Sequence, residues 1–525
     1  MAGGAPYFVP LTQSEKVVVP NHPLERSRPW QTPSGVSQNN LISLSEVEDD
    51  ASQSVQRVNA GHNSAMFDML AFDDGGEYLF IPHETPFGAG VTRYHRESDT
   101  SQLIFAGNQG GASNNWSADF GAFDPARWTP NQTLIVAEEW AGLGRVVELL
   151  KPMATPNDPI AGGTQLVEGR DFRILTAFAR VSHEGIHFSA RDPNKTVYFI
   201  DEHNSGAIYK LVFTEAGDYV GGGQTFVLVV DAFAGDSRAF WDAPINAAQP
   251  RTGMAHWQAM TDVSGVPLTT VNPFDRDSAQ ARPGRGAADE VGATPYGRPE
   301  DMVVGHLPNG HEVLYVTATS ERAVYSVEQL PDNRAIVRIF ASELHTPKNL
   351  GFSPTSATLD APDNLALDRL GNVYIIEDGP NNNDVGGDIW FARDLDSDGI
   401  AESLDHFMSL RVAGAEATGM VFHPHDHTRF VLSVQHPFST DRRLVTGGFG
   451  DAVWEFDVAD AKPPACLGPR REWLIRQTTE VRVAGEVLRP DPEPTLSAAC
   501  RSDDDLRFIQ QLKRLGSPHK AAIPP

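Results

Sequence analysis

The stretch that decides the fold is Val197-Tyr198-Phe199-Ile200-Asp201-Glu202, followed after a short polar turn by Gly206-Ala207-Ile208-Tyr209. β-Branched and aromatic residues fill both arms, a composition that is typical of a β-hairpin. The first arm ends in two adjacent acidic residues. The same plan recurs along the chain, which makes this hairpin one unit of a repeat.

Five further hairpins follow this plan. Their first arms are residues 78–84, 133–139, 313–317, 373–378 and 430–436. Continuous apolar runs such as 134–136 indicate strands buried on both faces, and the segments between hairpins offer few amphipathic helices for a parallel α/β sheet. Six hairpin-containing blades around a channel are the simplest architecture for such a repeat, and a two-sheet sandwich is the alternative. We therefore predict an all-β, six-bladed β-propeller.

The two ends of the chain do not fit the repeat. We expect residues 1–60 to form an extended N-terminal arm, residues 61–460 the propeller and residues 461–525 a C-terminal extension with a short helix at 503–515. Cys466 and Cys500 fit no zinc motif, and either a disulfide or two free thiols agrees with their spacing. The N-terminus lacks a signal-peptide pattern, which fits a cytoplasmic protein or a mature exported one.

The overall charge is strongly acidic. Asp and Glu number 69 against 42 Lys and Arg, a formal net charge of −27. This balance argues against a nucleic-acid partner, and no run of 18 apolar residues is present to span a membrane. The excess acid reflects either a self-repelling soluble surface or carboxylates that bind cations. The sequence also lacks a GxSxG elbow and a phosphate-binding glycine loop, which argues against serine hydrolysis and nucleotide binding.

Acidic residues stand at equivalent strand ends of the repeat, and a propeller would bring such positions to one ring near its axis. These positions hold Glu84, Glu138 or Glu139, Asp201 or Glu202, Glu377 or Asp378, and His436. So many carboxylates repel one another unless cations hold them together. Oxygen-rich sites suit Ca²⁺, Mg²⁺ or Mn²⁺, and mixed oxygen–nitrogen sites also suit iron. Solvated turn residues are the alternative; the register favours a metal centre.

Two further motifs carry candidate chemistry. Tyr296-Gly297-Arg298-Pro299-Glu300 precedes an apolar strand, so Arg298 could clamp a phosphate or carboxylate while Glu300 binds a metal; a surface ion pair is the alternative. An EF-hand-like spacing of oxygen ligands comprises Asp394, Asp396, Asp398 and Glu402. Asp405 stands where that loop expects a bidentate Glu. The segment is either a calcium loop or an acidic turn.

Several segments, in order across residues 60–456, resemble motifs of the PhoX family of alkaline phosphatases, a six-bladed propeller family. Residues 296–302 resemble its Arg-Pro-Glu motif, residues 182–185 its His-Glu stretch and residues 361–379 its Pro-Asp-Asn segment. Residues 416–419 and 435–437 resemble its Glu-x-Thr-Gly and Gln-His-Pro motifs. The resemblance implies a mixed iron and calcium cluster that hydrolyses phosphate esters, in a protein exported in the folded state.

Carried over by motif, the resemblance implies that Arg298 binds phosphoryl oxygen beside a set of carboxylate metal ligands. The candidate ligands are Glu138, Glu139, Glu184, Asp201, Glu202, Glu300, Glu377, Asp378 and Glu416. One position departs from the family, whose Thr-Cys-Glu-Glu strand end supplies a cysteine to iron. Here the stretch is Val136-Ala137-Glu138-Glu139, and the lost thiolate favours Mn²⁺ or Ca²⁺ over an iron–thiolate site.

These observations predict a metal-dependent phosphoric ester hydrolase that acts on a small-molecule phosphate monoester. Arg298 and Glu300 are the expected catalytic residues, and Ca²⁺ with a transition metal, Mn²⁺ or Fe³⁺, the expected cofactors. A phosphotriesterase or phosphodiesterase of the same fold is one alternative. A calcium-stabilised propeller without catalysis, acting as a binding module, is the other. From the resemblance we expect a periplasmic or secreted monomer without nucleic-acid or membrane partners.

Overall fold

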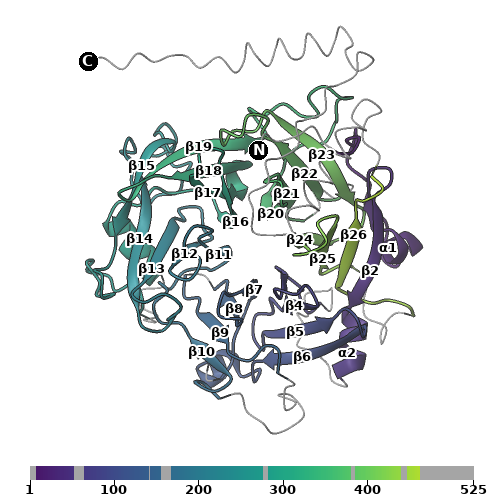
Figure 1. Ribbon diagram of the computed structural model, residues 1–525, viewed down its shortest axis with the longest axis horizontal. Helices are drawn as coiled ribbons and strands as arrows, with labels where there is room; N and C mark the ends of the chain where they lie inside the picture. Colours follow the sequence, from purple (N-terminus) through teal and green to yellow (C-terminus); the bar gives the residue numbers. More distant parts are fainter. Residues whose placement is uncertain are drawn as a thin grey trace, which may run out of the picture.

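The computed structural model describes residues 7–51, 64–116, 118–140, 142–154, 167–275, 282–379, 385–438 and 446–461. Within these ranges β-strands dominate, and they surround a central axis in a propeller-like ring (Figure 1). The helices are short: α1 (Pro23–Ser27), α2 (Leu44–Ala51), α3 (Pro283–Glu290) and the 3₁₀ turns η1 (Gly111–Asn114) and η2 (Thr319–Glu321). The all-β, propeller-like prediction is confirmed. Every described helix is too short or too polar to cross a bilayer.

The described strands form five antiparallel sheets, and each runs outward from the axis. One sheet contains β3 (Ala71–Phe72), β4 (Tyr78–Pro82), β5 (Gly90–His95) and β6 (Thr100–Ala106). The next contains β7 (Phe123–Trp128), β8 (Leu134–Glu138), β9 (Val146–Leu149) and β10 (Phe172–Ile174). A third contains β20 (Pro362–Leu367), β21 (Val373–Glu377), β22 (Asp388–Arg393), β23 (Ser403–Leu410) and β1 (Trp30–Gln31). Consecutive strands pair in each sheet, as a meander requires.

The largest sheet has nine strands because one strand links two meanders. The first meander contains β11 (Ile186–Phe188), β12 (Thr196–Ile200), β13 (Ile208–Phe213) and β14 (Gly223–Val230). The second contains β16 (Pro299–His306), β17 (Glu312–Ala318), β18 (Ala323–Gln329) and β19 (Arg334–Ser342). Strand β15 (Gly253–Ala259) pairs with both β14 and β19, so it joins the two meanders at their outer edges.

Strands from the two ends of the described chain share the remaining sheet. It contains β24 (Glu416–Phe422), β25 (Arg429–Gln435), β26 (Ala452–Asp457) and β2 (Ser37–Ser43). The N-terminal strand β2 pairs with β26, so backbone hydrogen bonds between the first and last parts of the ring close it. The domain boundaries at residues 60 and 460 stay predictions. The expected helix at 503–515 and both cysteines lie outside the described residues.

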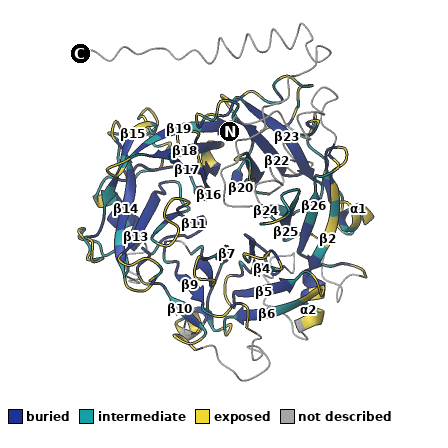
Figure 2. Cartoon of the chain, viewed as in Figure 1, coloured by how far each residue is buried: buried dark blue, intermediate teal, exposed yellow. Residues whose placement is uncertain are grey.

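The hydrophobic core lies between neighbouring sheets. Figure 2 shows that buried residues fill the strands, whereas exposed residues lie mainly in the turns. One core cluster packs Ile135 and Val146 of the β7–β10 sheet against Phe199 and Tyr209 of the next. Neighbouring sheets therefore hold one another face to face, and the innermost strands β7, β11, β16, β20 and β24 surround the axis (Figure 1).

Candidate metal centre

One acidic residue lies at or near the start of each innermost strand. The six are Asp68 before β3, Asp124 in β7, Glu184 before β11, Glu300 in β16, Asp363 in β20 and Glu416 in β24. We call this set the inner ring. Carboxylate oxygens of Glu184, Glu300 and Asp363 all lie within 4.8 Å of one another. The first five residues are buried, with at most 6% of any side chain exposed.

β-Bulges aim half of the inner ring at the axis. The strand register shifts between Phe123 and Ala126, between Pro299 and Met302, and between Pro362 and Leu365. These intervals contain the inner-ring acids Asp124, Glu300 and Asp363. A bulge adds one residue to a strand and redirects its side chains, which is why bulges are frequent beside active sites.

A second set of polar residues follows the second strand of five units. This outer ring comprises Glu84 after β4, Glu139 after β8, Glu202 after β12, Asp378 after β21 and His436 after β25. The two rings form one cluster, because Glu84 contacts Asp68 and Glu139, and Glu139 contacts Glu202. On the other side Asp378 contacts Glu416, whose Oε2 lies 3.1 Å from His436 Nε2.

The structure separates the adjacent acids that the sequence left as alternatives. Successive strand residues point to opposite sides, so Glu138, Asp201 and Glu377 turn away from the rings. Arg145 binds Glu138, with Nε 2.6 Å from Oε2, and Arg285 NH2 lies 2.6 Å from Asp201 Oδ1. Glu377 accepts hydrogen bonds from the backbone N–H of Asp360 and Asp388 and from the Trp390 indole. These three carboxylates are held by partners outside the cluster, whereas Glu139, Glu202 and Asp378 contact other acids of the rings.

Burial and mutual repulsion dominate the electrostatics of the rings. Burial raises the pKa of Asp68 to about 6, of Glu300 to about 7 and of Glu84 to about 8. Burial, with neighbouring carboxylates second, also raises the pKa values of Asp124, Glu139, Glu184, Asp363 and Glu416 well above their ordinary range. The cluster is therefore poorly able to ionise by itself, and cations would reverse that tendency.

Two orphaned oxygens test whether this cluster fits metal ions. Asp124 Oδ1 and Glu184 Oε2 are buried and have no hydrogen-bond partner among the described residues. Buried carboxylate oxygens are normally paired, so both are available as ligands. Oxygen donors with one imidazole, from His436, suit Ca²⁺, Mg²⁺ and Mn²⁺. The residues present fit a site for such cations.

Arg298 is the cationic side chain in contact with both rings. Its Nε lies 2.7 Å from Glu202 Oε1 and its NH2 2.9 Å from Glu300 Oε1. Burial disfavours the charge, but Glu300 and Glu202 outweigh it and raise the pKa of Arg298. Its backbone has the left-handed φ of 50°, an uncommon conformation for this residue type that is found at functional sites. The side chain remains 36% exposed and is open to an anion.

The position of the family's cysteine holds no metal ligand here. Ala137 is fully buried and packs in an apolar cluster with Ile135 and Val146. No cysteine occurs among the described residues, because both lie after residue 461. The donors that the structure describes at this centre are therefore oxygen atoms and one imidazole.

The candidate calcium loop connects β22 to β23. Oxygens of Asp394, Asp396 and Asp398 lie within 4.8 Å of one another. Glu402 instead accepts a hydrogen bond from the Leu395 backbone, at 2.6 Å. Asp405 lies outside the group because Arg393 NH2 binds its Oδ1 at 2.7 Å. Three of the four predicted ligands are thus gathered, and the site itself stays a prediction.

Sequence reasoning missed half of the inner ring, namely Asp68, Asp124 and Asp363. Each precedes the outer-ring acid of its own unit by a similar distance in sequence: Asp124 stands 15 residues before Glu139, and Asp363 stands 15 before Asp378. A search for two acids 15 residues apart, rather than for acids at strand ends alone, would have found Asp124 and Asp363.

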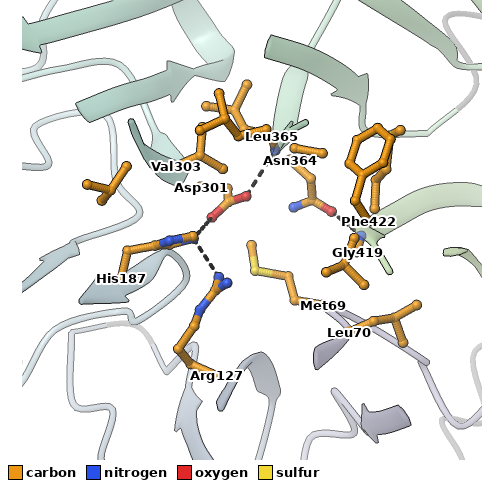
Figure 3. A pocket seen from close by; sticks show the side chains of 15 residues that line it. Met69, Leu70, Arg127, His187, Asp301, Val303, Asn364, Leu365, Gly419 and Phe422 are labelled. Atoms are coloured by element: carbon orange, nitrogen blue, oxygen red, sulfur yellow. Dashed lines mark hydrogen bonds and ion pairs between the residues drawn. The ribbon is translucent and has the colours of Figure 1, made fainter. Parts of the chain in front are cut away.

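The channel continues below the inner ring as a cavity of about 260 Å³ (Figure 3). Apolar side chains such as Met69, Leu70 and Phe422 line most of it. Arg127, His187, Asp301 and Asn364 supply its polar part, with Arg127 NH2 2.5 Å from His187 Nε2. Burial, assisted by Arg127, lowers the pKa of His187 well below its usual range. Most residues that line this part of the channel are apolar, whereas the rings above it are acidic.

Comparisons with known proteins add two findings. The family model of alkaline phosphatase PhoX matches residues 170–438. The structure of Pseudomonas fluorescens PhoX in complex with vanadate, a transition state analogue, superposes with a TM-score of 0.54 at 16% identity. That match covers 85% of this chain and 98% of the other. At this identity the structural likeness establishes the fold alone.

Other solved structures match at lower TM-scores. A gluconolactonase from Xanthomonas campestris gives a TM-score of 0.35 at 13% identity, over 87% of this chain and 98% of that one. A Bacteroides thetaiotaomicron protein of unknown function gives 0.39 at 10% identity, over 80% and 76%. Both values are too low to support an argument about activity. No curated protein matches the sequence.

Proposed function

Because this chain belongs to the alkaline phosphatase PhoX family, it is a metal-dependent phosphatase, and we propose that its two acidic rings hold the metal ions of the active centre. The observation that carries this proposal is the convergence of ten buried or half-buried carboxylates on one axis beside Arg298. So high a density of like charge is costly without bound cations. The substrates of such an enzyme are small-molecule phosphate esters.

The ligands we propose are the inner ring together with Glu139, Glu202 and Asp378. Glu300, Glu184 and Asp363 form the closest group, and His436 adds an imidazole beside Glu416. We assign Ca²⁺ and a transition metal to this centre, with Mn²⁺ favoured over Fe³⁺ because Ala137 supplies no thiolate. Bound cations neutralise the charge that develops on phosphoryl oxygens and lower the pKa of water.

Arg298 binds and orients the phosphoryl group in this proposal. Glu202 and Glu300 each bind its guanidinium group, so the orientation of that group is fixed before the substrate binds. A preformed cation of this kind stabilises charge on the equatorial oxygens without the cost of reorganisation. Glu300 has a double role, as metal ligand and as partner of Arg298.

Three finer proposals accompany this function. The meanders β11–β14 and β16–β19 each contain four strands, which supports counting six blades with β15 as a link. The gathered oxygens of Asp394, Asp396 and Asp398 support a structural calcium loop. Action outside the cytoplasm, by a monomer with the predicted N-terminal arm and C-terminal extension, rests on the family resemblance.

Elemental analysis of the purified full chain beside Glu300→Gln tests the proposed centre. Glu312→Gln is the matched control, since Glu312 is equally buried but binds Ser189 and Tyr198. We expect the wild type and the control to retain a transition metal and hydrolyse a chromogenic phosphate monoester. Glu300→Gln should lose both properties.

The same samples distinguish the alternatives. Calcium alone, unchanged in Glu300→Gln and without esterase activity, would favour a binding module and contradict the proposal. Faster hydrolysis of a phosphate diester or triester than of the monoester would keep the centre and reassign its substrate. A lost metal in the Glu312→Gln control would mean that general destabilisation, not ligation, explains the result.

A further inference from the structure

The exposed aromatic residues of this protein are gathered on one face. Among the described residues, only Phe87, Phe240 and Phe438 are both aromatic and exposed, at 41%, 49% and 45%. Phe87 follows Glu84 by three residues and Phe438 follows His436 by two. The Phe240 ring lies 5.5 Å from that of His203, which adjoins Glu202. Phe87 and Phe438 therefore stand on loops that carry the outer ring, and Phe240, on the loop between β14 and β15, packs beside a third such loop.

Partly buried aromatic rings add to this set. Three glycines lie two or three residues before inner-ring acids, and an aromatic ring occupies the space where a side chain on each would lie. The pairs are Gly121 with Trp140, Gly297 with Trp241, and Gly414 with Phe438. Trp140 adjoins Glu139 and packs edge-on against Trp116 at 5.0 Å. We call Phe87, Trp140, Phe240, Trp241 and Phe438 the aromatic rim.

The rim lies where the organic part of a bound ester must go. A phosphoryl group held at Arg298 has the proposed metal-binding carboxylates around it, and these offer no contact to an apolar group. The solvent-exposed side of Arg298 gives the direction of exit. The loops on this side carry the aromatic rim, so the group attached to phosphorus leaves the centre across it.

We propose that the aromatic rim binds the organic group of the substrate, so that this enzyme prefers phosphate esters of aromatic or other apolar alcohols. The inference rests on the proposed function, because it needs the phosphoryl group at Arg298. Single exposed apolar side chains are ordinary on soluble proteins, but apolar side chains that gather in one place commonly mark a ligand-binding site. Flat rings held against glycine backbone offer stacking surfaces that lose little side-chain entropy on binding.

Phosphonate binding tests the inference without interference from leaving-group reactivity, because the carbon–phosphorus bond is not hydrolysed. We would measure inhibition constants of phenylphosphonate and methylphosphonate on the metal-loaded full chain. One aromatic contact strengthens binding by about two- to thirteen-fold, so two such contacts should make phenylphosphonate bind about five-fold tighter or more. The double variant Phe240→Ala/Phe438→Ala should lose most of this preference and leave methylphosphonate binding unchanged.

A control variant and a turnover assay make every result decisive. Met254→Ala removes an exposed apolar side chain from the peripheral strand β15 and should change neither constant. Equal binding of the two phosphonates, or a preference that survives in the double variant, overturns the inference while the phosphatase assignment stands. If neither phosphonate binds and no ester is hydrolysed, both the proposed function and this inference are wrong.

Discussion

Neutralising Glu138 and neutralising Glu139 should have opposite consequences, although the two residues are adjacent at the end of β8. The Glu138 carboxylate is 2% exposed and accepts hydrogen bonds from Arg145 Nε and NH2 and from the backbone N–H of Gly121 and Arg145. Glu138→Gln leaves a buried guanidinium without its counter-charge. Removing one partner of a buried pair costs about 3–5 kcal/mol, and this is the loss of unfolding free energy that we expect.

Glu139 lies in the acidic cluster, where Glu84 and Glu202 repel it. Glu139→Gln removes one of these repulsions, so the chelated protein should be as stable as the wild type or more stable. The cost should appear instead in metal content and in phosphatase activity. The assay is urea unfolding in excess chelator at pH 7, combined with elemental analysis of the same preparations before chelation.

The result that refutes this reasoning is the reverse pattern, in which Glu138→Gln strips metal and Glu139→Gln unfolds the protein. A second adjacent pair provides an independent repetition. Asp201 is bound by Arg285 and Glu202 contacts Glu139, so Asp201→Asn should destabilise and Glu202→Gln should lose metal. If the two pairs behave differently, the alternation of side chains at the strand ends does not explain the division of roles.

Three further predictions follow from the site. Chelated protein should lose stability as pH rises from about 4 to about 8. Asp68, Glu300 and Glu84, with pKa values of about 6, 7 and 8, keep protons that the unfolded chain releases near pH 4. Thermal unfolding at pH 5 and at pH 8.5 checks this, and equal stability at the two pH values contradicts it. Arg298→Ala should lower kcat/KM by about 10²–10³-fold with metal content intact, and unchanged turnover would remove Arg298 from the mechanism. Asp394→Asn should lower the calcium content by one ion per chain without affecting hydrolysis. An unchanged calcium content would mean that this segment is an acidic turn and not a calcium loop.

The propeller-like arrangement could be predicted because each hairpin can be recognised from its own short stretch of sequence. Apolar runs such as 134–136 and 197–200 appear in the structure as β8 and β12, whose residues are buried on both faces. Strand β15 could not be predicted, because its role depends on pairing with β14 and also with β19, which follows it by more than 70 residues of chain. The edge strand β2 could not be predicted either, because Ser37-Gln38-Asn39-Asn40 has no strand-like composition and its pairing partner β26 lies at the other end of the described chain.

The site was partly predictable for a related reason. Acids at strand ends are visible in sequence, but which of two neighbours faces the axis depends on where each strand stops and bends. Glu300 and Asp363 occupy bulges, and a bulge breaks the two-residue alternation on which a sequence argument relies. Asp124 stands next to Pro125, so it reads as a turn residue although it lies at the axis.

The paired acids explain how the fold tolerates so much charge at its centre. In three units the acid before the outer-ring carboxylate is bound by groups outside the rings: Arg145, Arg285 of α3, or backbone N–H groups with an indole. These contacts fix the strand ends that carry Glu139, Glu202 and Asp378. Repulsion among the ring carboxylates therefore acts on side chains whose backbone is already anchored, so loss of metal should leave the ring folded. Chelated protein should accordingly be inactive at temperatures and pH values at which it is still folded. If activity and folded structure were instead lost under the same conditions, the ions, and not these contacts, would hold the blades together.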